Sequence, residues 1–270
     1  MSEIPPLTYA GLRYVIAFFA LLPFAFKKER KEEIKNLQSR DWLKLIALGF
    51  LFYTFTQGAQ FMGLSLLPAV TVSLLLNFTP LVVAVMGIFL LSEKPAILQW
   101  LGAFLFILGI LTYFYPVNLS KNQTLGIIVM IIGVLANSGS AVLGRSINRE
   151  KKLSAITVTI ISMGVGSIII LIAGIIIQGL PAISLKTFLF LLWLAIINTA
   201  FAFTLWNLTL RTLTAMESSI INGTMLIQIA VLAWIFIDES ISLQEGMGML
   251  VAAAGAFLVQ VKRKKALKLQ

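Results

Sequence analysis

The sequence contains neither cysteine nor histidine. Without cysteine the chain has no disulfide and no thiol nucleophile. Without histidine it lacks the commonest metal ligand and the commonest general base. An enzyme within the membrane would need another nucleophile with its base, or a metal, and no pair of acidic residues lies inside an apolar stretch. We therefore expect no catalytic residue, no metal site and no cofactor, and a chain that is not an enzyme.

Charge is also scarce. Only 12% of the residues are charged and 59% are hydrophobic, whereas a soluble domain carries roughly 25% charged residues. Apolar runs recur along the chain, and each is long enough to cross a hydrocarbon core about 30 Å thick. The fold class is therefore an all-α polytopic membrane protein, since barrel strands would alternate polar and apolar residues over about ten positions. The expected partner is the lipid bilayer, and no cleavable signal peptide is expected.

Nine membrane spans are predicted. They cover residues 7–26, 42–63, 70–91, 96–115, 123–144, 154–178, 186–207, 215–237 and 243–261. If the basic connector 27–40 is cytoplasmic, most of the 21 lysines and arginines lie on that side, which fits the positive-inside bias. The net charge of +10 is thus explained by membrane orientation, so nucleic acid is not an expected partner. We expect a cell-membrane protein with a cytoplasmic C-terminus.

The stretch 67–94 has a second copy at 218–240. The matched positions are Asn77 and Asn222, 145 residues apart, and Glu93 and Glu239, Gly102 and Gly248, and Gly109 and Gly255, each 146 apart. This near-constant offset predicts a duplicated chain. The first repeat covers residues 1–116 with four helices, the second covers 122–262 with five, and 263–270 forms a basic cytoplasmic tail. An odd number of helices per repeat turns one repeat upside down, a recurring plan of secondary transporters whose substrate site lies near the midplane.

Three stretches carry a family resemblance: PPLTYAGLRY (5–14), SLLLNFTPLVVAVMGIFLLSEK (73–94) and QWLGAFLFILGILT (99–112), with second-half counterparts. The chain resembles EamA-type members of the drug/metabolite transporter superfamily. The resemblance implies ten helices in two inverted five-helix repeats, both termini cytoplasmic, and transport of small metabolites. This sequence departs from that pattern by lacking the first helix, so we expect Met1 to be an internal start or a truncation. It also departs at Met225, which replaces Pro80 in the second half.

Arg13 is a charge inside a predicted span, and such residues are functional by default. The resemblance implies that the family characteristically has arginine at this position. Contact with substrate and anchorage to neighbouring carbonyls are both open, and the side chain is also long enough to reach the interface.

Polar residues in the spans are candidates for a substrate path. Tyr53, Gln57 and Gln60 have the i, i+4, i+7 spacing of one helix face. That face suits either a cavity or hydrogen bonds between helices, which contribute about 0.6 kcal/mol each. Asn77 and Asn222 are expected to face each other as a symmetric pair. The other candidates are Asn137, Asn198 and Trp206, and an interfacial role competes for Trp206 and its neighbour Asn207.

Helix packing is expected at the four repeated glycines, Gly102, Gly109, Gly248 and Gly255, because small residues let helices approach closely. Pro80 removes a backbone donor and should kink its helix beside Asn77.

No acidic residue lies clearly at mid-membrane. Glu93 and Glu239 sit at helix ends and are interpreted as interfacial caps. Glu217 is expected to pair with Arg211. A carboxylate proton relay is therefore not evident.

Taken with the resemblance, the sequence favours a transporter of small metabolites, amino acids or related amphipathic solutes, working in the efflux direction by alternating access. The alternative is a flippase-like relative that handles a lipid-linked substrate. The oligomeric state, a homodimer included, is left open.

Overall fold

The computed structural model describes residues 3–116, 123–237 and 241–260. The first part contains α1 (Pro6–Ala25), α2 (Lys28–Lys35), α3 (Ser39–Gly49), the π-helix η1 (Phe50–Thr56), α4 (Gln57–Leu66), α5 (Ala69–Leu76), α6 (Thr79–Leu91) and α7 (Ile97–Phe114). The second contains α8 (Thr124–Arg149), α9 (Ala155–Gln178), α10 (Leu185–Ala195), the π-helix η3 (Ile196–Phe201), α11 (Ala202–Thr209), α12 (Ala215–Gly223), α13 (Met225–Ile237) and α14 (Leu243–Gln260). The described residues form no strand, which confirms the all-α fold class.

Eight helical segments in the described part of the chain are long and apolar enough to cross a membrane. They match eight of the nine predicted spans. The remaining one, 215–237, is divided into the short helices α12 and α13. Their combined length is comparable to that of the span Thr71–Leu91, which α5 and α6 divide in the same way.

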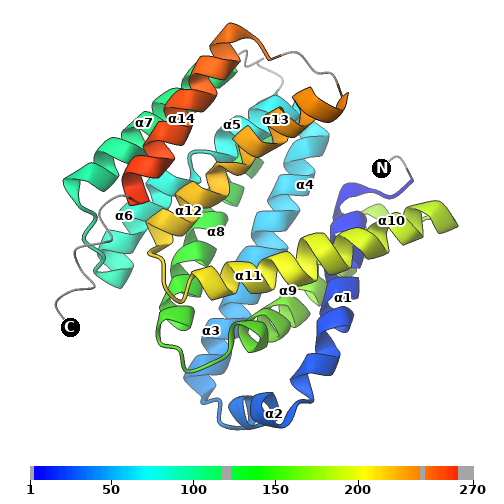
Figure 1. Ribbon diagram of the computed structural model, residues 1–270. Helices are drawn as coiled ribbons and strands as arrows, with labels where there is room; N and C mark the ends of the chain where they lie inside the picture. Colours follow the sequence, from blue (N-terminus) through cyan, green and yellow to red (C-terminus); the bar gives the residue numbers. More distant parts are fainter. Residues whose placement is uncertain (1–2, 117–122, 238–240, 261–270) are drawn as a thin grey trace.

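Two segments differ from the predicted connectors. The basic connector 27–40 contains α2, an exposed helix held at the end of the molecule by Glu33 (Figure 1). The fifth span continues to Arg149 instead of ending at 144. Arg145 and Arg149 extend the helix because their guanidinium groups donate to the carbonyls of Leu210 and Leu91, at 2.8 and 3.2 Å. Charge alone marked them as loop residues, but these contacts keep them helical.

The helix order of the first part recurs in the second. Helices α3, η1, α5, α6 and α7 begin at residues 39, 50, 69, 79 and 97, and α10, η3, α12, α13 and α14 begin at 185, 196, 215, 225 and 243. Each pair is separated by 146 residues. Even the π-helical turn within the long span is repeated. Helix α8 has no counterpart among the described helices of the first part.

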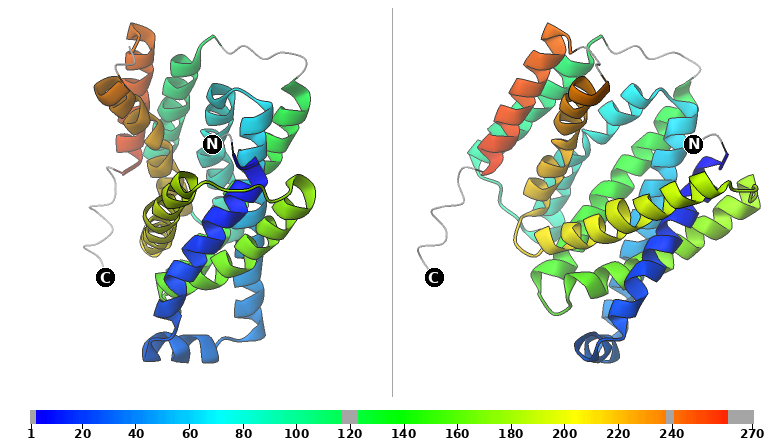
Figure 2. Two further views of the ribbon diagram at one scale, coloured as in Figure 1. Left: turned by 90° about the vertical axis from the view of Figure 1, so that its right-hand side faces the viewer. Right: turned by 45° about the vertical axis from the view of Figure 1, so that its right-hand side comes forward.

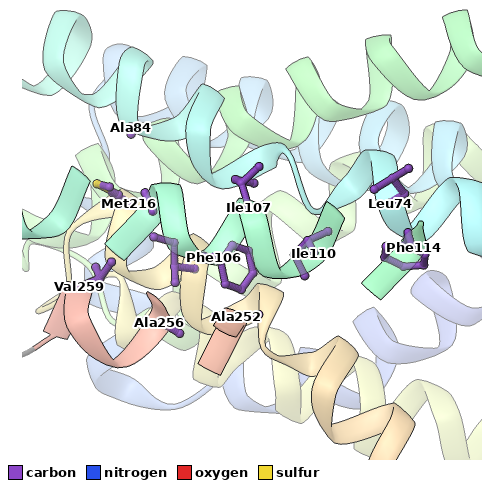
Figure 3. Close-up of a cluster of buried hydrophobic side chains, with 12 residues drawn as sticks. Leu74, Ala84, Phe106, Ile107, Ile110, Phe114, Met216, Ala252, Ala256 and Val259 are labelled. Atoms are coloured by element: carbon purple, nitrogen blue, oxygen red, sulfur yellow. The ribbon is translucent and has the colours of Figure 1, made fainter. Parts of the chain in front are cut away.

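One pair related by this offset, α7 and α14, also packs together, and so do α1 and α9. α7 lies beside α14 along its length, and α1 lies beside α9 (Figures 1 and 2). Helix α8 runs through the centre, in contact with η1, α4 and α6. One buried apolar cluster fills the space between α7, α12 and α14, with Phe106 pointing towards Ala252 and Ala256 (Figure 3).

The four repeated glycines lie where α7 meets α14. A Cβ on Gly102 would lie 2.7 Å from the carbonyl oxygen of Gly255, and one on Gly109 would lie 2.3 Å from the amide nitrogen of Ala252. A Cβ on Gly248 would lie 2.6 Å from the amide nitrogen of Tyr113, and one on Gly255 would lie 2.4 Å from that of Phe106. Only glycine allows two backbones to approach so closely.

Candidate substrate pathway

Each half of the protein contains a broken helix near the middle of a span. α5 ends at Leu76, α6 begins at Thr79, and Pro80 occupies the first turn of α6. In the second half α12 ends at Gly223 and α13 begins at Met225. Proline suits the first turn because its missing N–H would have had no helical partner there. The chain bends at these places without losing its backbone bonds, because the amides of Asn77, Phe78 and Thr224 still donate to carbonyls three or four residues earlier, at 3.1, 3.1 and 3.2 Å.

Asn77 closes the end of α5. Its side chain is 7% exposed, and Nδ2 donates to the Ser73 carbonyl at 2.8 Å. Its Oδ1 lies 3.4 Å from where a Cβ on Gly223 would be. The offset of 146 therefore pairs Asn77 with Gly223. The expected symmetric pairing with Asn222 is wrong by one residue. Because one residue turns a helix by about 100°, Asn222 lies instead on the exposed side of α12.

The polar strip of the second span does not form one continuous lining. Tyr53 and Gln57 are buried, and only Gln60 remains partly exposed. The Tyr14 hydroxyl donates to Gln57 Oε1 at 2.6 Å. The Tyr53 ring packs edge-on against Tyr14, with ring centres 5.6 Å apart. The π-helical turn of η1 changes the spacing assumed from the sequence, because a π-helix has more residues per turn than an α-helix.

Arg13 joins α1 to the π-helix η3. Its Nε donates to Thr199 Oγ1 at 2.8 Å, and Nη2 lies 3.4 Å from the carbonyl oxygen of Asn198. Thr199 is fully buried, whereas the Asn198 side chain is exposed. Both partners of the guanidinium are uncharged, and no carboxylate of the described residues lies within 4.0 Å of it.

The other candidates of the second half lie in separate places. Asn137 on α8 is half-buried, and its Nδ2 is 3.4 Å from Thr79 Oγ1 at the start of α6. Trp206 packs against the apolar cluster that includes Val83 and Ala215. The structure therefore brings Asn137 close to the break beside Asn77 and leaves Trp206 in a packing role.

Sequence reasoning missed a buried amide network at the α8–α9–α11 contact. Asn148 Nδ2 donates to Asn207 Oδ1 at 2.8 Å, and Asn207 Nδ2 donates to Thr159 Oγ1 at 3.0 Å. Asn148 lies between the predicted spans 123–144 and 154–178, where arginines flank it, so the sequence predicts a connector at this position. The signal that could have found it is the four-residue spacing of Asn148 from Gly144, which keeps both on one helix face.

Glu93 ties three elements together at the end of the molecule that carries α2. Oε1 lies 3.5 Å from Arg145 Nε on α8 and accepts from the Ala215 amide of α12 at 3.4 Å. Burial raises the pKa of the Glu93 carboxyl, while the Ala215 hydrogen bond and the Arg145 charge act in the opposite direction. This is the geometry of a helix cap and loop anchor. Glu239 lies outside the described residues.

The expected pairing of Glu217 with Arg211 is wrong. Glu217 Oε2 accepts from the Thr214 amide at 2.9 Å, and the Thr214 hydroxyl accepts from the Glu217 amide at 3.2 Å. Arg211 donates to the Leu153 carbonyl at 3.2 Å. The spacing Thr214-x-x-Glu217 is a capping box, and it satisfies the free amides of the helix start better than a surface ion pair would.

Comparison with known proteins adds the family. Residues 1–115 and 124–261 match the model of the EamA-like transporter family. The chain belongs to this family. It is similar to two proteins of Bacillus subtilis (strain 168), the uncharacterized transporters YvbV and YoaV. The sequences are 28% and 22% identical, over 96% of this chain and 84% and 88% of the relatives. An uncharacterized transporter of Archaeoglobus fulgidus is 22% identical over 97% of the chain and 90% of its own length.

A solved crystal structure has the same fold, with a TM-score of 0.80, 14% identity, and coverage of 97% of this chain and 90% of that one. Family, relatives and apolar helices together make the protein a multi-pass membrane transporter. Membership of a transporter family suggests a role other than catalysis. Across the described ranges, no group of three acidic residues is placed to hold a metal ion.

An open apolar groove lies between α13 and α14. Its volume is about 540 Å³, and Trp234, Met247 and Leu250 contribute to its lining. None of the polar candidates lines it.

Proposed function

We propose that this transporter moves small amphipathic metabolites, amino acids among them, out of the cell by alternating access between two inverted repeats, residues 1–116 and 122–262. The observation that carries the proposal is the pair of helix breaks, after Leu76 and after Gly223, at equivalent places in the two parts of the chain. Discontinuous helices near the midplane are where secondary transporters bind their substrates.

The polar groups near these breaks are uncharged. Asn77 and Asn137 flank the start of α6, and Gln60 offers a partly exposed amide on α4. Amides supply donors and acceptors without fixing the charge of the solute, which suits neutral or zwitterionic metabolites. No carboxylate proton relay is included in the proposal.

In the proposed orientation, α2 and the charged ends of α3 and α8 face the cytoplasm, and the C-terminus is cytoplasmic as well. Lys44 and Lys152 pair with Glu150 and Asp41 at this end, which is the basic end of the molecule. The positive-inside bias supports this direction, and the cell membrane is the membrane proposed.

A flux assay tests the proposed path. Purified protein in proteoliposomes should release loaded radiolabelled amino acids faster than empty liposomes do. A double change of Gln60→Leu and Asn137→Leu should lower the flux at least tenfold, because it removes two partly exposed amides from the proposed path. The matched control is Thr112→Leu on α7, whose partly exposed hydroxyl donates to the Leu108 carbonyl of its own helix.

Unchanged flux in the double variant would reject this path. Equal loss in the Thr112→Leu control would mean that the change acts through folding.

A lipid-linked substrate is the alternative, and the groove between α13 and α14 favours it, since an acyl tail fits an apolar groove open to lipid. Transbilayer movement of a fluorescent phospholipid in the same liposomes, without amino-acid release, would support the alternative and reject the metabolite proposal.

A further inference from the structure

Among the arginines that the structure describes, Arg13 lies furthest from the ends of a membrane span. It lies within the span Pro6–Ala25, is only partly exposed, and has just the neutral oxygens of Thr199 and Asn198 as partners. Arg145, also on a membrane helix, has the carboxylate of Glu93 within 3.5 Å. A guanidinium keeps its charge in proteins, and a charge within a membrane helix is costly. Hydrogen bonds to neutral oxygens orient this charge but leave it uncompensated.

The π-helix η3 fixes one edge of the guanidinium. Thr199 Oγ1 accepts from Arg13 Nε and donates to the Leu194 carbonyl, five residues earlier, at 3.1 Å. This carbonyl lies where the wider π-helical turn begins, so the π-helical backbone fixes the position of the Thr199 hydroxyl. Nη1 has no hydrogen-bond partner in the part of the chain that the structure describes. An arginine held at Nε and Nη2, with the Nη1 donors unused, is prepared to bind a carboxylate.

A second unused donor lies one helical turn away. Tyr9 precedes Arg13 by four residues, on the same face of α1, and packs against Leu191 of α10. Its side chain is 4% exposed, yet its hydroxyl has no hydrogen-bond partner among the described residues. Leaving a buried hydroxyl unsatisfied costs the free energy of its lost hydration. An oxygen ligand between α1 and α10–η3 would satisfy this hydroxyl and neutralise Arg13 at the same time.

We infer that Arg13 and Tyr9, with Thr199 positioning the guanidinium, bind the carboxylate group of the transported solute. The inference rests on the proposed function and narrows it to solutes that carry a carboxylate. Arg13 supplies the charge, and Tyr9 supplies a neutral donor. The exposed amide of Asn198 beside them provides a polar surface at the entrance.

The test compares acids with their uncharged amides. The detergent-solubilised protein is titrated with phenylacetate, 4-methylpentanoate and N-acetyl-leucine, and with the three matching carboxamides, and the unfolding temperature is recorded. A ligand that binds the native state raises that temperature by mass action. At least one acid should stabilise the protein clearly more than its amide does. In Arg13→Gln the affinity for that acid should fall at least tenfold and become equal to that for the amide.

Two further variants keep the test independent of folding. Arg13→Lys retains the charge without the planar fork and should keep part of the preference for the acid. Tyr9→Phe should weaken acid binding several-fold without changing amide binding. Arg40→Gln, an exposed arginine at the start of α3, is the matched control and should bind acid as the unchanged protein does.

The outcomes separate this inference from the proposed function. Equal binding of acids and amides by the unchanged protein, or a preference that survives in Arg13→Gln, would overturn the carboxylate site. If liposomes then still release neutral solutes, transport stands and only the site is lost. Acid binding that depends on Arg13, without flux of any solute, would retain the site and overturn transport.

Discussion

Glu93 is a single carboxylate whose surroundings decide its charge. It lies in the short segment after α6, outside the membrane spans, and contacts both Arg145 and the Ala215 amide. Burial is the largest influence on it and raises its pKa above the usual value of 4.5. The folded state therefore holds the Glu93 proton more tightly than the unfolded state does. Its contribution to stability is fully present below pH 4.5 and is lost as the pH rises through the folded pKa.

The change Glu93→Gln should reveal this dependence. The unfolding temperature of the unchanged protein, relative to that of the variant, should fall as the pH rises from about 4 to about 7. The reason is that only the unchanged protein has a carboxyl group at position 93 that loses its proton. Thermal unfolding in detergent at a series of pH values measures the difference. Glu29→Gln, on the exposed surface of α2, is the control. A relative stability that rises with pH would show that the ion pair with Arg145 outweighs burial.

Tyr14 and Gln57 form a buried polar pair between α1 and α4. Tyr14→Phe removes the donor to Gln57 Oε1 and leaves that oxygen unsatisfied. The free energy of unfolding should fall by about 1–3 kcal/mol. Tyr115→Phe, whose side chain is 70% exposed, should have little effect in the same unfolding assay. Equal stability of the two variants would mean that Gln57 finds another partner.

For single residues, the sequence predicted which polar and charged side chains would form contacts inside the protein better than it predicted their partners. The isolated charge of Arg13 was visible, but Thr199 lies 186 positions away and only folding brings the two together. The Thr214–Glu217 capping box is local and readable, yet charge attraction wrongly pointed to Arg211.

At the scale of helices, apolar length predicted most spans within a few residues of their bounds. What it missed were features set by tertiary contact: the π-helical turns, the extension of α8, and the one-residue difference between Asn222 and Gly223. Periodicity assumes 3.6 residues per turn throughout, so each π-helical turn shifts the face that follows it. The repeated glycines were easier to find, because close backbone contact permits only one residue type.

The contact between α7 and α14 should respond sharply to a single methyl group. In Gly109→Ala the new Cβ would lie 2.3 Å from the Ala252 amide nitrogen, so the helices must separate. We expect a loss of about 1–3 kcal/mol, as in other overpacked contacts. Gly246→Ala is the matched control, since nothing lies within 4 Å of its Cβ, and it should be neutral or slightly stabilising. Unfolding in detergent compares the two, and similar stabilities would contradict close packing in the membrane.

At the scale of the whole molecule, the offset of 146 residues relates two sets of helices that run in opposite directions. α3 begins at the end that bears α2, whereas α10 begins near the described N-terminal residues (Figure 1). Hydrogen bonds support both placements: Lys152 contacts Asp41 on α3, and Glu3 contacts Ser184 just before α10. The inversion follows because equivalent spans are five places apart in the chain, an odd number, so they cross the membrane in opposite directions.

Arg40 and Lys186 provide a direct test of the inversion. They are the second residues of α3 and α10, lie 146 positions apart, and are both exposed. Because the chain has no cysteine, Arg40→Cys and Lys186→Cys each introduce a single thiol without background. A membrane-impermeant maleimide should label Lys186→Cys on intact cells and Arg40→Cys only after permeabilisation. Labelling of both from the same side would contradict inverted repeats. Reversed labelling would retain the inversion and place the basic end outside the cell.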